Sequence, residues 1–177
     1  MDGIEGRQTL VTGAATPVGR AVVEDLVAAG ARVIAVDATD ETVEQAIEEL
    51  GLADADEVIT RGLDEGELGS WWDLSNLIAA FYHELDAFVH IPKGPTRESL
   101  PKAVDRLKLA LQNAELSEPG RVSIVVVSSD AEETLRSVAN QLTEEGSGIR
   151  VSALEPGEPS ATAKSVLERI SIEGSPA

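Results

Sequence analysis

The sequence contains no cysteine and few aromatic side chains, which make up 3% of its 177 residues. Without thiols the chain forms no disulfide bond and no thiolate metal site, and cysteine usage does not indicate a redox compartment. The start of the sequence lacks a basic segment followed by an apolar one, and no apolar run approaches the length that spans a membrane. These absences favour a soluble, cytoplasmic protein.

Basic side chains are also scarce, since 14 lysines and arginines stand against 32 aspartates and glutamates, a formal net charge of −18. Such an acidic protein repels phosphate, so nucleic acid is not expected as a partner. Adaptation to salt and attraction to a basic partner both explain the acidic surface, and the sequence leaves them open. The least self-repelling stretch is the middle of the chain, where five basic residues lie between positions 93 and 108.

Apolar and amphipathic segments alternate along the chain, with short connections and no internal repeat. Strands are predicted over residues 8–11, 32–36, 58–59, 87–90, 122–127, 150–154 and 170–172. Helices are predicted over residues 18–29, 41–50, 70–85, 99–114, 132–145 and 161–168, with Pro101 in the first turn of its helix. Strands that alternate with helices predict an α/β fold, a doubly wound parallel sheet of about seven strands with helices on both faces. We expect a single domain over residues 1–177.

A glycine-rich segment from Thr12 to Gly19 follows the first predicted strand, and Asp37 closes the second. Asp64 follows the third strand, Ser128 and Ser129 end the fifth, and Pro156 and Gly157 follow the sixth. In this order and spacing, the segments resemble the short-chain dehydrogenase/reductase family over nearly the whole chain. The resemblance implies a Rossmann fold.

The resemblance also implies that Gly13, Gly19, Asp37 and Asp64 bind a dinucleotide. Pro17 stands where the family has a glycine, and proline removes an amide hydrogen next to the pyrophosphate. Asp37 is suited to accept hydrogen bonds from a ribose, which favours NAD over NADP, or alternatively caps the turn that follows it. The family's Asn-Asn-Ala-Gly loop is replaced by residues 90–93, His-Ile-Pro-Lys. We therefore expect either no cofactor or weakly bound NAD.

The family's reaction needs a serine, a tyrosine about a dozen residues later, and a lysine four residues beyond the tyrosine. Here Ser129 is followed almost at once by the helix predicted over 132–145, and the stretch for tyrosine and lysine is missing. The only tyrosine is Tyr82, and Asp86 stands four residues after it. We interpret Ser129 as a remnant, predict no catalytic residue, and regard the chain as a truncated and catalytically degenerate member.

The two histidines offer little alternative chemistry. His83, with Glu84 and Asp86, lacks the spacing of a zinc-binding helix, so no metal site is predicted. His90 at the end of a strand is interpreted as structural, and its role as a proton donor is kept as an alternative.

Members of the family commonly dimerise through the helices after the fourth and fifth strands, which correspond here to residues 99–114 and 132–145. The first of these helices has a wide apolar band, which either covers the sheet or forms an interface. The leading hypothesis is a non-catalytic subunit, a pseudoenzyme that forms a homo- or hetero-oligomer with itself or with an active relative in an oxidoreductase assembly. The alternatives are an active NAD(P)-dependent oxidoreductase and an NAD-binding sensor without chemistry.

Overall fold

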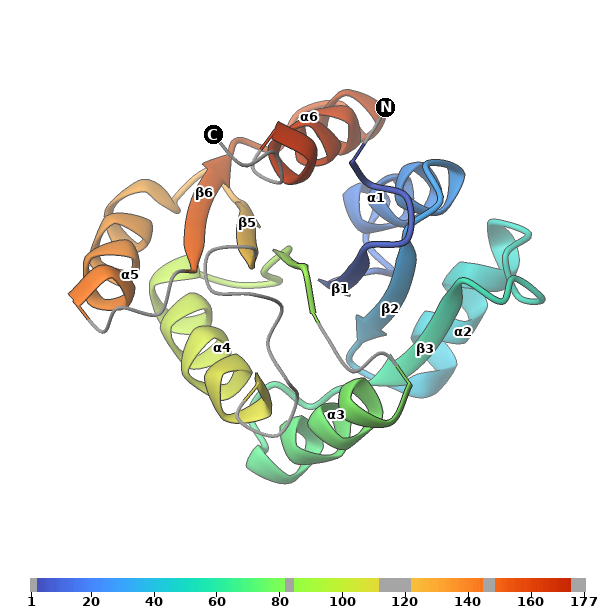
Figure 1. The fold of residues 1–177 in the computed structure, drawn as a ribbon, viewed down its shortest axis with the longest axis horizontal. Coiled ribbons are helices and arrows are strands. Elements are labelled where there is room, and N and C mark those ends of the chain that lie inside the picture. The colour runs from blue at the N-terminus through green and yellow to red at the C-terminus, as the bar shows by residue number, and fades with distance from the viewer. Residues whose placement is uncertain (1–2, 82–84, 112–121, 145–148, 173–177) are drawn as a thin grey trace.

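The structure of the protein, a computed structural model, describes residues 3–81, 85–111, 122–144 and 149–172. Within them, six parallel strands form one sheet in the order β3-β2-β1-β4-β5-β6 (Figure 1). The strands are β1 (Gln8–Thr12), β2 (Arg32–Asp37), β3 (Val58–Gly62), β4 (Ala87–His90), β5 (Ser123–Val127) and β6 (Arg150–Leu154). The strand order reverses between β1 and β4, the position at which ligands bind in open α/β sheets.

Six helices connect and cover the strands of the described residues. They are α1 (Pro17–Ala28), α2 (Asp40–Glu49), α3 (Leu68–Phe81), α4 (Thr96–Leu111), α5 (Glu132–Glu144) and α6 (Pro159–Ile172). Helices α1, α2 and α6 pack in one apolar core, and α3, α4 and α5 pack in another on the opposite face (Figure 1). The predicted α/β fold with a doubly wound parallel sheet is confirmed.

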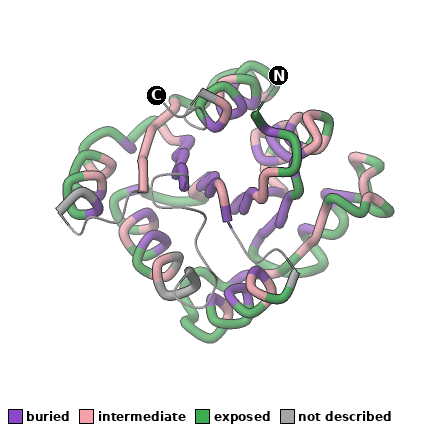
Figure 2. The backbone as a smooth tube through the Cα atoms, in the orientation of Figure 1, coloured by how far each residue is buried: buried purple, intermediate pink, exposed green. Residues whose placement is uncertain are grey.

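The strands are apolar on both faces because both faces are covered. Successive side chains of a strand point to opposite sides, so Leu10 of β1 belongs to the core beneath α3–α5, whereas Val11 belongs to the core beneath α1, α2 and α6. Ile124 and Val125 of β5 divide in the same way. Figure 2 shows the resulting pattern, with buried residues concentrated in the strands and on the inner sides of the helices.

Helix α1 begins one residue before its predicted start, whereas α4 begins three residues before its predicted start. Thr16 caps α1 by accepting a hydrogen bond from the amide of Gly19, with Pro17 in the first helical position. Helix α4, however, begins at Thr96, three residues before the predicted start, because the carboxylate of Asp130 accepts a hydrogen bond from the Thr96 amide. Pro101 therefore lies inside the helix and not in its first turn, which corrects the prediction.

Residues 170–172, predicted as a small strand, form the last turn of α6. Val166, Leu167 and Ile170 follow helical spacing and are buried in the core beneath α1, α2 and α6, so packing favours the helix over the strand propensity of isoleucine. The predicted helix ends at 85, 114 and 145 depend on residues 82–84, 112–114 and 145, which lie outside the described residues. Within the described chain, every helix is too short or too polar to cross a bilayer.

Candidate functional site

The glycine-rich segment after β1 is tightly packed. Gly13 has a positive φ of 71°, and a Cβ atom there would lie 2.4 Å from the carbonyl oxygen of Ile91. A Cβ atom on Gly19 would lie 2.1 Å from the carbonyl oxygen of Gly13. Real Cβ atoms do not approach backbone so closely, so the fold itself requires glycine at both positions.

Most backbone amides of this segment already donate hydrogen bonds to acceptors within the protein. Ala15 donates to the Asp37 carboxylate over 3.0 Å, Thr16 donates to the Gly13 carbonyl, and Gly19 donates to the Thr16 hydroxyl. Pro17 has no amide hydrogen to donate. A diphosphate at this helix start would have to compete for donors that already have acceptors.

Asp37 ends β2 with its side chain fully shielded from solvent. Besides the Ala15 amide on Oδ2, the carboxylate accepts a hydrogen bond from the Ala38 amide on Oδ1, over 2.7 Å, and Lys93 Nζ forms an ion pair with Oδ1. Burial acts to raise the pKa of Asp37, but hydrogen bonds from Lys93, Ala38 and Ala15 outweigh it and hold the pKa below its ordinary value. The carboxylate is therefore ionised at neutral pH.

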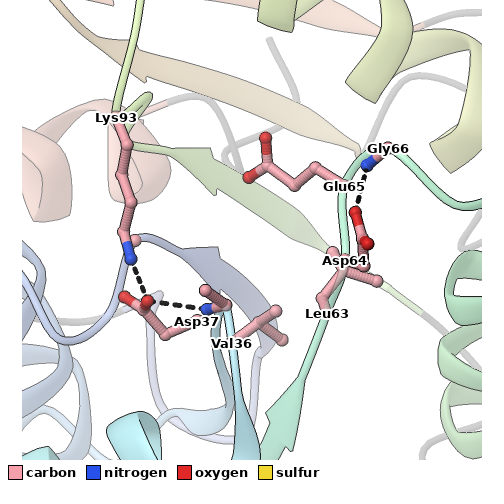
Figure 3. Close-up of a pocket in the computed structure, with 9 residues that line it drawn as sticks. Val36, Asp37, Leu63, Asp64, Glu65, Gly66 and Lys93 are labelled. Atoms are coloured by element: carbon pink, nitrogen blue, oxygen red, sulfur yellow. Dashed lines mark hydrogen bonds and ion pairs between the residues drawn. The ribbon is translucent and has the colours of Figure 1, made fainter.

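A cavity of about 390 Å³ lies beside Asp37 at the carboxyl ends of β1, β2 and β3. Gly13, Asp37, Asp64, Glu65 and Lys93 contribute to its wall. Figure 3 shows Lys93 reaching Asp37 on one side while Glu65 extends into the space on the other. Burial raises the pKa of Glu65, and the neighbouring ammonium of Lys93 opposes this rise. Such a cavity is suited to a ligand that carries hydroxyl groups as donors to carboxylates.

Three of the four predicted cofactor-binding residues, Gly13, Asp37 and Asp64, line this one cavity. The fourth, Gly19, lies in α1 beneath the glycine-rich segment and supports it by packing. The carboxylate of Asp64 already has one partner in the protein, because its Oδ1 accepts a hydrogen bond from the Gly66 amide over 2.8 Å. The sequence analysis did not predict Lys93 as a site residue. The only feature that could have indicated it was the presence of a lysine in the loop after β4.

A second polar group lies at the end of β5. The Ser128 hydroxyl donates to Asp130 Oδ1 over 2.5 Å, and the buried Thr96 Oγ1 lies 2.6 Å from Ser128 Oγ and 2.5 Å from Asp130 Oδ1. Hydrogen bonds from Ser128 and Thr96 lower the pKa of Asp130. The adjacent Ser129, interpreted from the sequence as a remnant, is exposed. We name Thr96, Ser128 and Asp130 the β5-end cluster.

His90 is fully buried at the end of β4. Its Nδ1 lies 2.8 Å from the Thr12 hydroxyl and its Nε2 lies 3.3 Å from the Ser99 hydroxyl, so both ring nitrogens have partners. Burial lowers the pKa of His90 to about 4, and the ring is neutral at pH 7. This environment supports a structural role for the side chain.

The remaining candidates for chemistry are metal-binding side chains and Tyr82. Among the residues that the structure describes, no three histidine, aspartate or glutamate side chains are grouped to hold a metal ion. Tyr82, His83 and Glu84 lie outside those residues.

Comparison with sequence families gives one match. The family model described as short chain dehydrogenase matches residues 7–94, which include the glycine-rich segment, Asp37, Asp64 and Lys93. The sequence matches no curated protein.

Solved structures show the same fold at low sequence identity. A short-chain dehydrogenase/reductase from Brucella melitensis, described as glucose/ribitol dehydrogenase, is 18% identical with a TM-score of 0.75, and the match covers 97% of this chain and 92% of that one. A metagenomic short-chain oxidoreductase in complex with NADP is also 18% identical, with a TM-score of 0.72 and coverages of 98% and 93%. A short-chain dehydrogenase from Streptomyces avermitilis is 21% identical, with a TM-score of 0.67 and coverages of 93% and 84%.

Proposed function

This chain belongs to the short-chain dehydrogenase/reductase family, and we propose that it is a non-catalytic member that works as a subunit of an oxidoreductase assembly. The observation that carries the proposal is the β5-end cluster. Where the family resemblance implies a serine beside a tyrosine and a lysine, Ser129 is exposed, and the neighbouring Ser128 donates to Asp130.

The chemistry of proton transfer supports the same proposal. A phenol needs a neighbouring cation to become a useful acid near neutral pH, and Tyr82, the only tyrosine of the sequence, is followed at the fourth position by Asp86 instead of a lysine. The buried His90 is not an imidazolium at pH 7 and so is a weak proton donor, and both of its ring nitrogens have hydrogen-bond partners. Neither residue supplies the missing acid.

A steady-state assay tests the loss of catalysis. The purified chain, given NADH or NADPH and a panel of ketones, is expected to show no turnover. Turnover that disappears in His90→Ala would instead support the active oxidoreductase with an unusual proton donor. Turnover that appears only after addition of a full-length relative would fit a subunit that needs its partner.

The assembly is proposed to form through α4 and α5, with a second copy or an active relative. An open groove of about 390 Å³ lies between the two helices, with Arg97 and Pro101 of α4 and Glu133, Ser137 and Gln141 of α5 in its wall. In the apolar band of α4, Ala103 and Val104 are buried against the sheet, which leaves the groove as the candidate contact. The rest of that band (Leu107, Ala110, Leu111, Ala114) has side chains outside the described part of the chain.

Co-purification from the native host, followed by light scattering, tests the assembly. We expect a complex larger than the single chain. Gln141→Arg places charge and bulk in the groove and is expected to dissociate the complex, whereas Gln45→Arg on the exposed side of α2 is the matched control and leaves it intact. A protein that is isolated alone and is monomeric would contradict this role.

A second candidate function, a nucleotide-binding module without chemistry, is favoured by the cavity beside Asp37. Its buried carboxylate suits the hydroxyl groups of an adenosine ribose, while the occupied amides of the glycine-rich segment disfavour tight binding of a diphosphate. Calorimetric titration with NAD⁺ and with adenosine tests it. Weak binding that is lost in Asp37→Ala but kept in Asp54→Ala, an exposed control, is the expected result.

A further inference from the structure

Lys93 reaches Asp37 from the loop that follows a different strand of the sheet. It lies in the loop after β4, on the far side of β1 from β2, so its side chain crosses the glycine-rich segment to reach the carboxylate. Figure 3 shows its extended side chain ending at Asp37, at the wall of the cavity. The pair therefore joins the connections after β2 and β4, which lie on either side of β1.

The acceptor capacity of Asp37 is nearly used. A carboxylate offers about four lone-pair positions, and here the amides of Ala15 and Ala38 and the ammonium of Lys93 take three of them. A ligand with two adjacent hydroxyl groups needs two positions. The backbone amides belong to the fixed turns around β2, so the ammonium is the donor that must leave.

The two partners differ in how freely they can move. The Asp37 side chain has no solvent exposure, whereas 51% of the Lys93 side chain is exposed. A long side chain with half of its surface in water can change rotamer without unpacking the core. The ion pair is thus a contact that a ligand can displace at its lysine end.

A place for the displaced ammonium exists on the other side of the cavity. Glu65 extends into the same space, and its charge interacts with that of Lys93. Asp64, next to it, is partly occupied by the Gly66 amide. Movement of Lys93 toward Glu65 would keep the cation near the acidic wall while it frees Asp37.

We propose that Lys93 is a specificity-determining residue of this cavity, an internal latch whose ammonium occupies the acceptor position on Asp37 that a nucleoside's adjacent hydroxyl groups require. The proposal rests on the second candidate function above. Ligands with a 2′,3′-diol displace the latch at a cost in affinity, and ligands without the diol do not displace it. Weak binding of the ribose hydroxyl groups is then a property of Lys93, separate from the occupied amides that disfavour a diphosphate.

Calorimetric titration with adenosine, NAD⁺ and 2′,3′-dideoxyadenosine tests the latch. Lys93→Gln removes the cation and is expected to bind adenosine and NAD⁺ about tenfold more tightly than the natural chain, the scale of one partly exposed ion pair to a buried group. The gain is expected to be absent for 2′,3′-dideoxyadenosine. Lys93→Arg keeps the ion pair and the natural affinity, and Lys164→Gln, at an exposed position of α6, is the matched control.

Thermal unfolding of each variant accompanies the titrations, and Lys93→Met replaces Lys93→Gln where the latter is unfolded. Equal or weaker adenosine binding without the lysine would overturn the latch, since weaker binding would make Lys93 a ligand contact. The same gain with the dideoxy compound would also overturn it. If neither the natural chain nor any variant binds adenosine or NAD⁺, the nucleotide-binding function is wrong and the latch with it, an outcome distinct from the others.

Discussion

The carboxyl edge of the sheet has two polar regions that are built in opposite ways. Beside β2, a buried carboxylate is held by one long, half-exposed lysine and two backbone amides, and a cavity of about 390 Å³ remains next to it. Beside β5, the Asp130 carboxylate is held by two short hydroxyl side chains and by the amide that begins α4. The cation of the first group is half-exposed and free to change rotamer, whereas the second group is part of how a helix starts.

This difference indicates that the polar residues at the end of β2 are suited to bind a ligand, whereas those at the end of β5 have a structural role. A ligand can replace Lys93 because the amine can move into water or toward Glu65. A ligand that replaced Thr96 at Asp130 would remove the acceptor of a helix N-terminus. We therefore propose that the β2 end is the functional region and that the β5-end cluster is a brace for the start of α4.

The largest expected effect tests whether the glycine-rich segment beside the β2 region is rigid. Gly19→Ala places a Cβ atom 2.1 Å from the Gly13 carbonyl oxygen, and the three nearest atoms are all backbone atoms of Gly13 and Ala14, which cannot move aside as a flexible side chain can. We expect a loss of more than about 3 kcal/mol in the free energy of unfolding, measured by denaturant titration. Gly69→Ala, in α3 with open space around it, is the control and is expected to change stability by less than about 1 kcal/mol, upward. Equal effects of the two changes would mean that the segment adapts.

The next effect concerns His90, which lies between the two regions. Its pKa is about 4 in the folded protein and 6.5 without burial, so the unfolded chain binds the proton first as the pH falls. Stability from this group is complete above pH 6.5 and is lost as the pH falls toward 4, by about 3 kcal/mol. His90→Gln is expected to lose that much less stability between pH 7 and 4, measured by denaturant titration at each pH. Identical pH slopes would show that the imidazole is charged or exposed.

The sequence predicted the fold and singled out Gly13, Asp37 and Asp64 of the cavity wall because both depend on local patterns. Strands apolar on both faces, such as β1 and β5, indicate a covered parallel sheet. Asp37 and Asp64 follow neighbouring parallel strands, and the ends of such strands meet at one edge. Gly13 was recognisable from its motif, although its packing under Ile91 was not.

Contacts between distant residues could not be predicted in the same way. Lys93 and Asp37 are 56 positions apart, and their pairing depends on the path of the loop after β4. Asp130 begins α4 from 34 positions away, so the sequence near Thr96 gave no reason for an early start or for Pro101 inside the helix. The end of α6 was misread because strand propensity competes with packing, which only the assembled core decides.

A smaller effect separates the contribution that the charge of Asp37 makes to stability from the contribution of its shape. Asp37→Asn keeps the size of the side chain but loses the ion pair, and one amide donor then faces an NH₂ group. We expect a loss of about 2 kcal/mol at pH 7. Because the folded pKa lies below the ordinary 3.8, the natural contribution is present above that pH and lost as the pH falls through the folded value. Denaturant titrations should therefore converge for the two proteins in strong acid, and a difference independent of pH would point to packing instead.

The smallest effect measures how firmly the β5-end cluster braces the fold. Thr96→Val removes a buried hydroxyl without changing the shape of the side chain, and Ser128 and Asp130 keep their bond to each other. The Thr96 amide also keeps its acceptor, so we expect a loss of only about 1 kcal/mol in the free energy of unfolding. Thr60→Val in β3, where the half-buried hydroxyl has no hydrogen bond to the described residues, is the control and is expected to be neutral or slightly stabilising. If Thr96→Val were as stable as the control but changed ligand binding, the β5 end would be a site and not a brace, and the contrast between the two regions would be wrong.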